Sequence, residues 1–221
     1  AIRDREVYPA DLERVIDAAQ AVAIPADQKI IHVLPQEFTI DNQRGIREPV
    51  GMAGVRLEAD VHMITGSVSA SQNIVNCIRR CELEVDNIVL EQLASSYAVL
   101  TDDEKELGVC LVDIGGGTTD IAAFTAGAIT HTAVIPIAGD QVTNDIAIVL
   151  GTPTRSAESI KINHGSVSVT ELAANEEPIS IKVPSIGGKD TKTVSSEMLT
   201  KIIEPRYEEL FALIKNELDR F

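Results

Sequence analysis

Apolar residues in the first part of the chain follow two intervals that predict its local structure. Spacing at three and four residues predicts helices over residues 9–23 and 69–81. Alternation of apolar and polar residues predicts strands over residues 29–40 and 55–65, and Pro35 indicates a bulge or an edge in the first strand. The order helix, strand, strand, helix is that of a compact α+β unit.

The rest of the chain alternates between strand-like and helix-like segments. The patterns predict a short strand, a helix, an acidic loop, three strands with tight turns, two helices, a small antiparallel sheet and a final helix. The short strand covers residues 85–90, the next helix 91–100 and the acidic loop 101–108. The three strands cover residues 109–114, 120–125 and 128–137, and a helix follows over 139–150. The second helix has Ser156 as its N-cap, the small sheet covers residues 165–194 and the final helix 195–221. Pro205 falls inside the final segment, so we expect that helix to break near residue 203 and to restart.

Composition and charge narrow the classes of function. The chain has 34 acidic and 19 basic residues and a net charge of −15, which argues against nucleic-acid binding and against direct adsorption to anionic lipid. Aromatic residues make up 3% of the chain, so the core must consist of Val, Ile, Leu and Ala. Cys77, Cys81, Cys110 and the four histidines lack the spacing of metal ligands. Buried apolar positions are the favoured interpretation of the cysteines.

The stretch DIGGGTTDIA carries the clearest chemistry in the sequence. An apolar strand ends at Asp113, three glycines and two threonines follow, and a second strand begins at Asp120. Glycines can adopt positive φ and bring backbone N–H groups together, and such a group of donors holds an anion. No lysine and no helix follow the glycines, so the pattern differs from a P-loop and from a dinucleotide-binding turn. The candidate ligands are Gly115, Gly116, Gly117, Thr118 and Thr119 for a phosphate, and Asp113, through water, for Mg²⁺.

Two further segments fit a nucleotide site. Gly139 and Asp140 lie at a strand-to-helix junction, and a helix N-terminus attracts phosphate. Glu158 and Lys161 lie three residues apart on one predicted helical face, where they could contact a ribose hydroxyl and a base. Plainer alternatives stay open for both features. The turn could be a glycine-rich hairpin without a ligand, and the pair could be an exposed helical ion pair.

These motifs resemble those of the actin, heat-shock chaperone and sugar-kinase superfamily. LVDIGGGTTDIA is similar to its second phosphate loop, and LEQLASSYAVL is similar to its connecting helix. A closer resemblance is to the FtsA family of bacterial cell division proteins, through HVLPQEFTIDNQRGIREPVGMAGVRLEADVHMIT, LASSYAVLTDDEKELGVCLVDIGGGTTDIA and IIEPRYEEL. The resemblance implies an α/β (α+β) fold of the actin/Hsp70-like, ribonuclease-H type, with an inserted 1C subdomain and a small 2B subdomain.

The resemblance also implies how the chain is divided. Residues 1–82 resemble the 1C subdomain, 83–106 part of 1A, 107–160 subdomain 2A with the second phosphate loop, and 161–221 subdomain 2B with its exit helix. The family's first phosphate loop, its late adenine-contacting glycines and its C-terminal membrane helix have no match here. We therefore expect an internal fragment of a longer protein, whose own ATP binding is weak or absent.

The implied function is that of an actin-like cell division protein. Such a protein binds ATP and Mg²⁺, has weak ATPase activity at best, and polymerises into filaments. It tethers FtsZ to the cytoplasmic face of the inner membrane at the division septum, and reaches the membrane only through the C-terminal helix. The residues that would face the nucleotide are Asp113, Gly115, Gly116, Gly117, Thr118, Thr119, Gly139, Asp140, Glu158 and Lys161.

The implied partners are other division proteins. The acidic FtsZ tail would dock on 2B near Lys201, Arg206 and Tyr207, and other division proteins would bind 1C. Two alternatives remain within the superfamily, a small-molecule phosphotransferase and a heat-shock-type chaperone. Residues 1–82 contain no obvious sugar-binding constellation, which weighs against the phosphotransferase.

Overall fold

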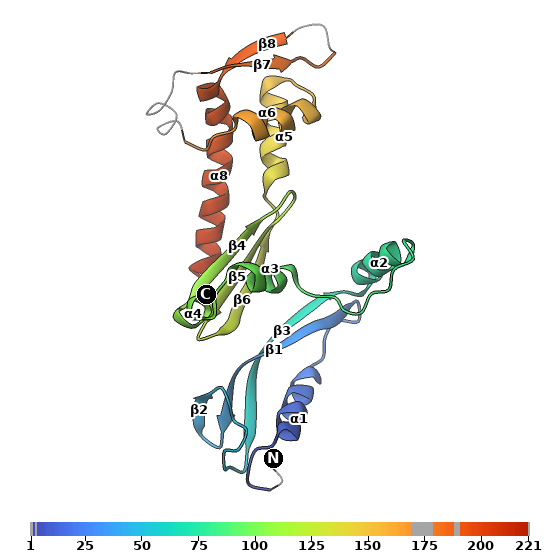
Figure 1. The fold of residues 1–221 in the computed structure, drawn as a ribbon, viewed down its shortest axis with the longest axis vertical. Coiled ribbons are helices and arrows are strands. Elements are labelled where there is room, and N and C mark those ends of the chain that lie inside the picture. The colour runs from blue at the N-terminus through green and yellow to red at the C-terminus, as the bar shows by residue number, and fades with distance from the viewer. Residues whose placement is uncertain (1, 3, 169–178, 188–190, 221) are drawn as a thin grey trace. The chain divides into compact units, whose positions relative to one another are not determined.

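The computed structural model describes residues 2, 4–168, 179–187 and 191–220, whose fold is shown in Figure 1. The elements are, in chain order, α1 (Pro9–Gln20), β1 (Gln28–Ile40), β2 (Gln43–Ile46), β3 (Leu57–Ser67), α2 (Val68–Arg79), α3 (Glu91–Val99), α4 (Asp102–Leu107), β4 (Val109–Ile114), β5 (Thr119–Thr125), β6 (Ala128–Ile135), α5 (Gly139–Leu150), α6 (Thr154–His164), β7 (Ser180–Pro184), β8 (Thr191–Ser195) and α8 (Ser196–Leu218). The predicted mixture of helices and strands is confirmed.

The chain forms two compact units. One contains residues 1–111 and 122–132, and the other contains residues 112–121 and 133–221. The sheet β4–β5–β6 contributes residues to both units. These two units are coarser than the four subdomains that the resemblance implies, so those boundaries stay a prediction.

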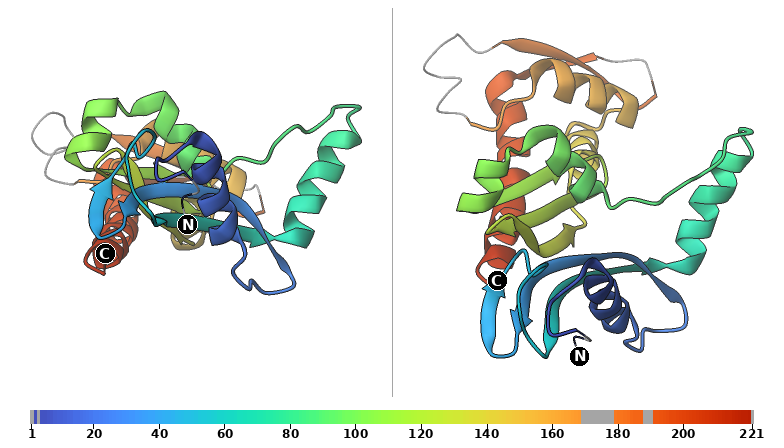
Figure 2. Two further views of the ribbon diagram at one scale, coloured as in Figure 1. Left: turned by 90° about the horizontal axis from the view of Figure 1, so that it is seen from below. Right: turned by 60° about the horizontal axis from the view of Figure 1, so that its bottom comes forward.

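The first unit is built on a three-stranded antiparallel sheet with the order β2–β1–β3, of which the short strand β2 was not predicted. The register of β1 on β3 shifts between Pro35 and Glu37, which confirms the bulge predicted at Pro35. Helix α1 lies along β1 and β3, as Figures 1 and 2 show. The buried core of this region consists of Ile2, Val7, Phe38, Ile40, Ile46 and Leu57.

Residues 85–90 are not a strand, contrary to the prediction from their short apolar run. A strand needs a neighbouring strand for its backbone hydrogen bonds. Among the described residues no strand pairs with this segment. The N–H group of Leu90 donates instead to Nε2 of His32, at 2.9 Å. A short apolar run alone therefore could not predict strand pairing.

The acidic stretch that was predicted to be a loop forms helix α4. Thr101 and Glu104 cap its first turn, because the Glu104 N–H donates to Thr101 Oγ1 (3.3 Å) and the Thr101 N–H donates to Glu104 Oε2 (2.8 Å). These bonds lower the pKa of Glu104, with the backbone bond from Thr101 as the largest cause. Gly108, with a φ of 106°, ends the helix. The T-x-x-E signature of such a capping box was present in the sequence.

The second unit packs α5, α6 and α8 against the antiparallel hairpin β7–β8 (Figure 1). The buried core described for this unit is aliphatic: Val142, Ile146, Ala147, Leu150, Ala157, Ile160, Ile181, Val183, Leu199 and Ile203. The composition predicted such a core for the whole chain, which is wrong for the first unit, because Phe38 and Phe124 are buried there. Of the sheet predicted over residues 165–194, residues 165–168 form no strand, and residues 169–178 and 188–190 lie outside the described part.

Two helix boundaries of the second unit differ from prediction. Helix α8 runs without a break through Pro205, because apolar residues on both sides of the proline, such as Ile203 and Leu210, are buried in the unit. Packing of these residues outweighs the hydrogen bond that a proline removes. Helix α6 begins at Thr154 with Pro153 as its N-cap residue, so Ser156 lies in the first turn and is not the cap.

Candidate functional site

The glycine turn joins two strands, as its sequence predicted. The N–H group of Gly115 donates to the carbonyl of Thr118 at 2.9 Å and closes the turn between β4 and β5. Residues 114–118 are exposed, and Asp113 is half-buried at the end of β4. A β-hairpin therefore presents this loop, and no helix begins at the glycines as one would in a P-loop.

The N-terminus of α5 contacts the same turn. Gly139 N–H donates to the Gly115 carbonyl at 3.1 Å, and Asp140 N–H donates to the Gly116 carbonyl at 2.7 Å. The structure therefore brings Gly139 and Asp140 to the glycines, where the sequence had placed them. Their two N–H groups hold the loop, so an incoming anion would meet other donors of this helix end or of the turn.

Positive φ is not the reason for these glycines, and the space for a side chain is tight only at Gly115. None of Gly115, Gly116 and Gly117 lies in the left-handed region, which differs from the conformation expected of them. A Cβ atom on Gly115 would lie 3.2 Å from the Thr118 carbonyl, and one on Gly116 would lie 3.5 Å from both carboxylate oxygens of Asp140. A Cβ on Gly117 would meet no atom within 4 Å. Packing within the chain therefore leaves Gly117 open on the exposed side of the turn.

The two threonines of the turn have different surroundings. Thr118 is exposed, and its hydroxyl donates to Asp120 Oδ2 at 3.0 Å. Thr119 is fully buried, and its hydroxyl donates to the Ile137 carbonyl at 2.7 Å. The expectation that both hydroxyls face a phosphate is therefore not met by Thr119, whose side chain ties β5 to the segment before α5.

Glu158 and Lys161 form a hydrogen-bonded cluster with the first turns of α5. Lys161 Nζ lies 2.7 Å from Glu158 Oε2 and donates to the Gly139 carbonyl (3.0 Å) and to Thr143 Oγ1 (2.8 Å). Thr143 also bonds to Glu158. The bond from Lys161, and then that from Thr143, lower the pKa of Glu158. The pair is thus more than an exposed helical ion pair, because it also binds the backbone next to the glycine turn.

Lys201 and Arg206 line one hollow of about 410 Å³, together with Asp145, Val149, Ile202, Pro205 and Glu209. Arg206 is held on both sides. Its Nε and Nη2 donate to the two oxygens of Asp145 at 2.7 and 3.1 Å, and its Nη1 donates to Glu209 Oε2 at 2.5 Å. The bond to Asp145 is the largest of the effects that raise the pKa of Arg206.

Tyr207 does not share this hollow with Lys201 and Arg206. It lines a separate hollow of about 290 Å³ in the same unit, together with Lys161 and Ser166. Its ring centroid lies 6.2 Å from that of Phe211. The three residues predicted to bind a partner therefore fall into two places, and Tyr207 lies beside a residue predicted to face the nucleotide.

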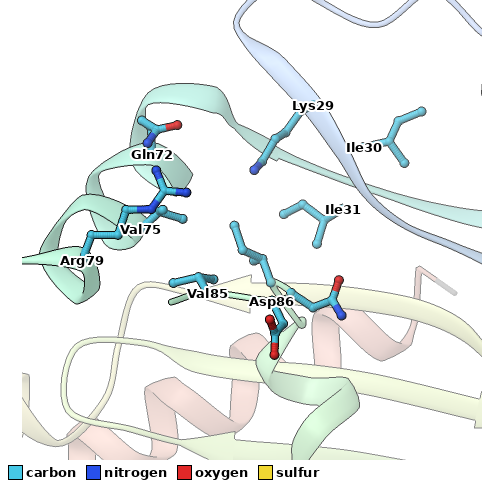
Figure 3. Close-up of a pocket in the computed structure, with 10 residues that line it drawn as sticks. Lys29, Ile30, Ile31, Gln72, Val75, Arg79, Val85 and Asp86 are labelled. Carbon is cyan, nitrogen blue, oxygen red and sulfur yellow. The ribbon is translucent and has the colours of Figure 1, made fainter. Parts of the chain in front are cut away.

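The first unit has a hollow of its own, of about 380 Å³, between the start of β1, α2 and the segment after α2. Figure 3 shows that the side-chain nitrogens of Lys29 and Arg79 point into this space and that Asp86 lies across from them. None of the site residues predicted from the sequence lines it. The charged residues that line this hollow lie far apart in the sequence, so no local sequence motif predicted the hollow.

The structure corrects the interpretation of the cysteines as buried apolar residues. Cys77 and Cys81 are exposed on and just after α2, and Cys110 is half-buried, with its thiol pKa raised by burial. Among the described residues no cluster of three or more His, Cys, Asp or Glu side chains is arranged to hold a metal ion. A Mg²⁺ ion at Asp113 would therefore need ligands from water or from a nucleotide.

Three residues of these sites were missed by the sequence reasoning. Thr143 lies between Lys161 and Glu158, and Asp145 and Glu209 flank Arg206. Asp145 is 61 positions from Arg206 in the sequence. No local pattern signals such a pair, because it depends on the packing of α5 against α8.

The chain matches two family models, described as "SHS2 domain inserted in FTSA" over residues 1–65 and "Cell division protein FtsA" over residues 110–216. It is 66% identical over 220 residues to the cell division protein FtsA of Pseudomonas aeruginosa, covering 100% of this chain and 52% of that protein. The chain belongs to the FtsA family. It is also 48% identical to FtsA of Escherichia coli K12 over 217 residues, which is 98% of this chain and 51% of that protein. The chain thus spans about half the length of these curated relatives.

Solved structures show that this FtsA chain has an actin-like fold. MreB5 of Spiroplasma citri bound to ADP superposes with a TM-score of 0.59 and 22% identity, over 71% of this chain and 49% of that one. The PilM–PilN type IV pilus biogenesis complex gives a TM-score of 0.62 and 15% identity, over 98% of this chain and 53% of that one. Of the helices in the described residues, none has the length and apolar character that a membrane crossing requires.

Proposed function

We propose that this chain is part of an actin-like protein that binds ATP and links FtsZ to the cytoplasmic membrane at the division site. The chain supplies one phosphate-binding wall and one partner-binding surface of that protein. Membership of the FtsA family favours this role over the phosphotransferase and the chaperone. The observation that carries the nucleotide proposal is the exposed hairpin turn against the N-terminus of α5, with open space beside Gly117.

The residues present fit an ATP phosphate. The exposed backbone at Gly116, Gly117 and Thr118 would approach the phosphate closely, because Gly117 has no Cβ atom and leaves the space beside the turn open for a ligand. Asp113 would hold Mg²⁺ through water, which would neutralise the carboxylates near the turn. Bound ATP would supply the negative charge that these donors and the ion balance.

The adenosine would lie toward Glu158 and Lys161. Lys161 lines the hollow of about 290 Å³ that also contains Val142, Ser166 and Tyr207, and this combination of apolar wall and polar edge suits a nucleoside. The related fold of MreB5 has been solved with ADP, which makes an adenine nucleotide the first candidate. The curated relatives are about twice as long as this chain, so we expect the chain alone to bind ATP weakly or not at all.

Substitution of Gly117 tests the nucleotide proposal. In a protein that carries this chain at the full length of its relatives, Gly117→Ala and Gly117→Val should weaken Mg-ATP binding in that order, by about tenfold or more for valine. Thermal unfolding of the ATP-free Gly117→Ala protein should barely change, because a Cβ atom at this position meets no protein atom within 4 Å. Calorimetry that gives the same ATP affinity for all three proteins would rule out this wall as the phosphate site.

The acidic FtsZ tail is the partner that we propose for the hollow at Lys201 and Arg206. Lys201 is exposed at its edge. The hollow thus offers a cation for a carboxylate of the peptide.

Charge reversal at Lys201 tests this surface without disturbing the bonds of Arg206. Lys201→Glu should weaken binding of a fluorescent FtsZ tail peptide by about fivefold or more. Lys215→Glu is the matched control, because it reverses an exposed lysine on the same helix outside the hollow. Equal losses for both variants in fluorescence anisotropy would show general repulsion and would remove this hollow from the proposal.

Filament formation and membrane attachment complete the proposed function. We expect the region of residues 1–65 to take part in self-association and in contacts with other division proteins, because it is a domain inserted into the fold. We also propose that the full-length protein attaches peripherally to the cytoplasmic side of the membrane. Sedimentation of the full-length protein with ATP, with and without residues 1–65, tests the role of this domain in self-association. Equal pelleting of the two proteins would exclude that role.

A further inference from the structure

The hollow at Lys201 and Arg206 carries balanced charges. Lys201 and Arg206 contribute two positive charges, and Asp145 and Glu209 contribute two negative ones. An acidic peptide would therefore meet no net positive charge there, although the peptide proposal depends on such attraction. Arg206, which would be the stronger carboxylate ligand of the two cations, is already occupied.

Most donors of the Arg206 guanidinium are already bonded. A guanidinium has about five N–H donors. Asp145 accepts from Nε and Nη2 and thereby occupies one bidentate edge, and Glu209 accepts from Nη1. Arg206 and Asp145 each have 27% of the side chain exposed, so water screens this pair only in part. The contact to Glu209, which is 51% exposed, is the more readily exchanged.

We propose that Asp145 is a built-in competitor for Arg206, which lowers the affinity of the hollow for acidic peptides and restricts it to those that displace this carboxylate. This inference rests on the peptide site proposed above. Asp145 has the chemistry of the ligand that it would exclude, since both are carboxylates that bind the same bidentate edge. In this structure Asp145, on α5, is the carboxylate that occupies this edge of Arg206.

Competition and mere positioning of Arg206 predict opposite results. If Asp145 competes, Asp145→Asn frees Arg206 and leaves the hollow with a net positive charge, so an acidic peptide binds more tightly. If Asp145 only orients Arg206, the same substitution loosens the guanidinium and weakens binding. The direction of the change therefore separates the two roles.

The test uses fluorescence anisotropy of the FtsZ tail peptide with the purified protein. Asp145→Asn should tighten binding by about threefold or more, and Glu209→Gln should do so by less. Glu208→Gln is the matched control, because this exposed acid on the same helix does not line the hollow; its effect should stay below about twofold. In an Arg206→Gln background, Asp145→Asn should bring little further gain.

Each other result has a definite meaning. Unchanged or weaker binding by Asp145→Asn overturns the competitor role, and so does an equal gain in the Arg206→Gln background or with Glu208→Gln. If Asp145→Asn fails to fold, Glu209→Gln decides by the same direction of change. If neither the unsubstituted protein nor any variant binds the peptide, the proposed peptide site itself is wrong.

Discussion

Arg206→Glu should destabilise the second unit, although the residue lies at a surface hollow. In the native state Arg206 joins α8 to Asp145 of α5 through two bonds and also bonds to Glu209. The substitution removes these bonds and places a third carboxylate beside the other two.

The magnitude follows from distance and exposure. Two unit charges about 4 Å apart interact by about 4 kcal/mol at an effective dielectric constant of about 20, before desolvation and solvent screening reduce the net contribution of the pair. Exposed pairs contribute about 0–1 kcal/mol, whereas breaking a buried pair costs about 3–5 kcal/mol. At 27% exposure of each side chain the pair lies between these limits. We expect a loss of about 1 kcal/mol for Arg206→Gln and about 2 kcal/mol for Arg206→Glu.

Urea unfolding followed by far-UV circular dichroism measures these losses. Arg220→Glu is the matched control, because Arg220 bonds to Glu217 at 3.2 Å but is 77% exposed; its loss should be below about 0.5 kcal/mol. High salt should reduce the difference between Arg206→Glu and Arg206→Gln, since it screens the added repulsion. Equal stability of Arg206→Glu and the unsubstituted chain would refute the view that this network holds α8 on α5.

Two predictions concern pH. Hydrogen bonds from Lys161 and Thr143 lower the pKa of Glu158. The contribution of Glu158 to stability is therefore complete above about pH 4.3 and is lost as the pH falls below that value. In a plot of the urea midpoint against pH, Glu158→Gln should flatten the decrease on the acid side, and an unchanged decrease would contradict this assignment. Burial, and then the charge of His131, lower the pKa of His62, so its neutral form stabilises the fold above about pH 6.5 and this contribution is lost as the pH falls through the lower folded value. A proton NMR titration of His62 should give a midpoint below about 6.5, and one at or above it would exclude burial as the dominant cause.

The parts of the site that are local in sequence were predicted well. The strand–glycine turn–strand order and the start of α5 at Gly139 follow from short-range patterns of apolar residues and glycines. The reason for the glycines was not predictable, because it depends on a carbonyl of Thr118, on the carboxylate of Asp140 and on open space. The buried position of Thr119 likewise depends on Ile137, which packing brings to it.

The sequence by itself determined the mixed α/β order, the hairpin character of the glycine turn, the mainly aliphatic core and the likeness to FtsA, because these depend on periodicity, composition and contiguous motifs. Tertiary structure decided which charges meet. It brought Lys161 to Gly139 and Thr143, paired Arg206 with Asp145, and separated Tyr207 from Lys201. It also decided that residues 85–90 lack a strand partner in the described part of the chain, and that α8 continues through Pro205. Each of these outcomes depends on packing between elements distant in sequence, which no local pattern encodes.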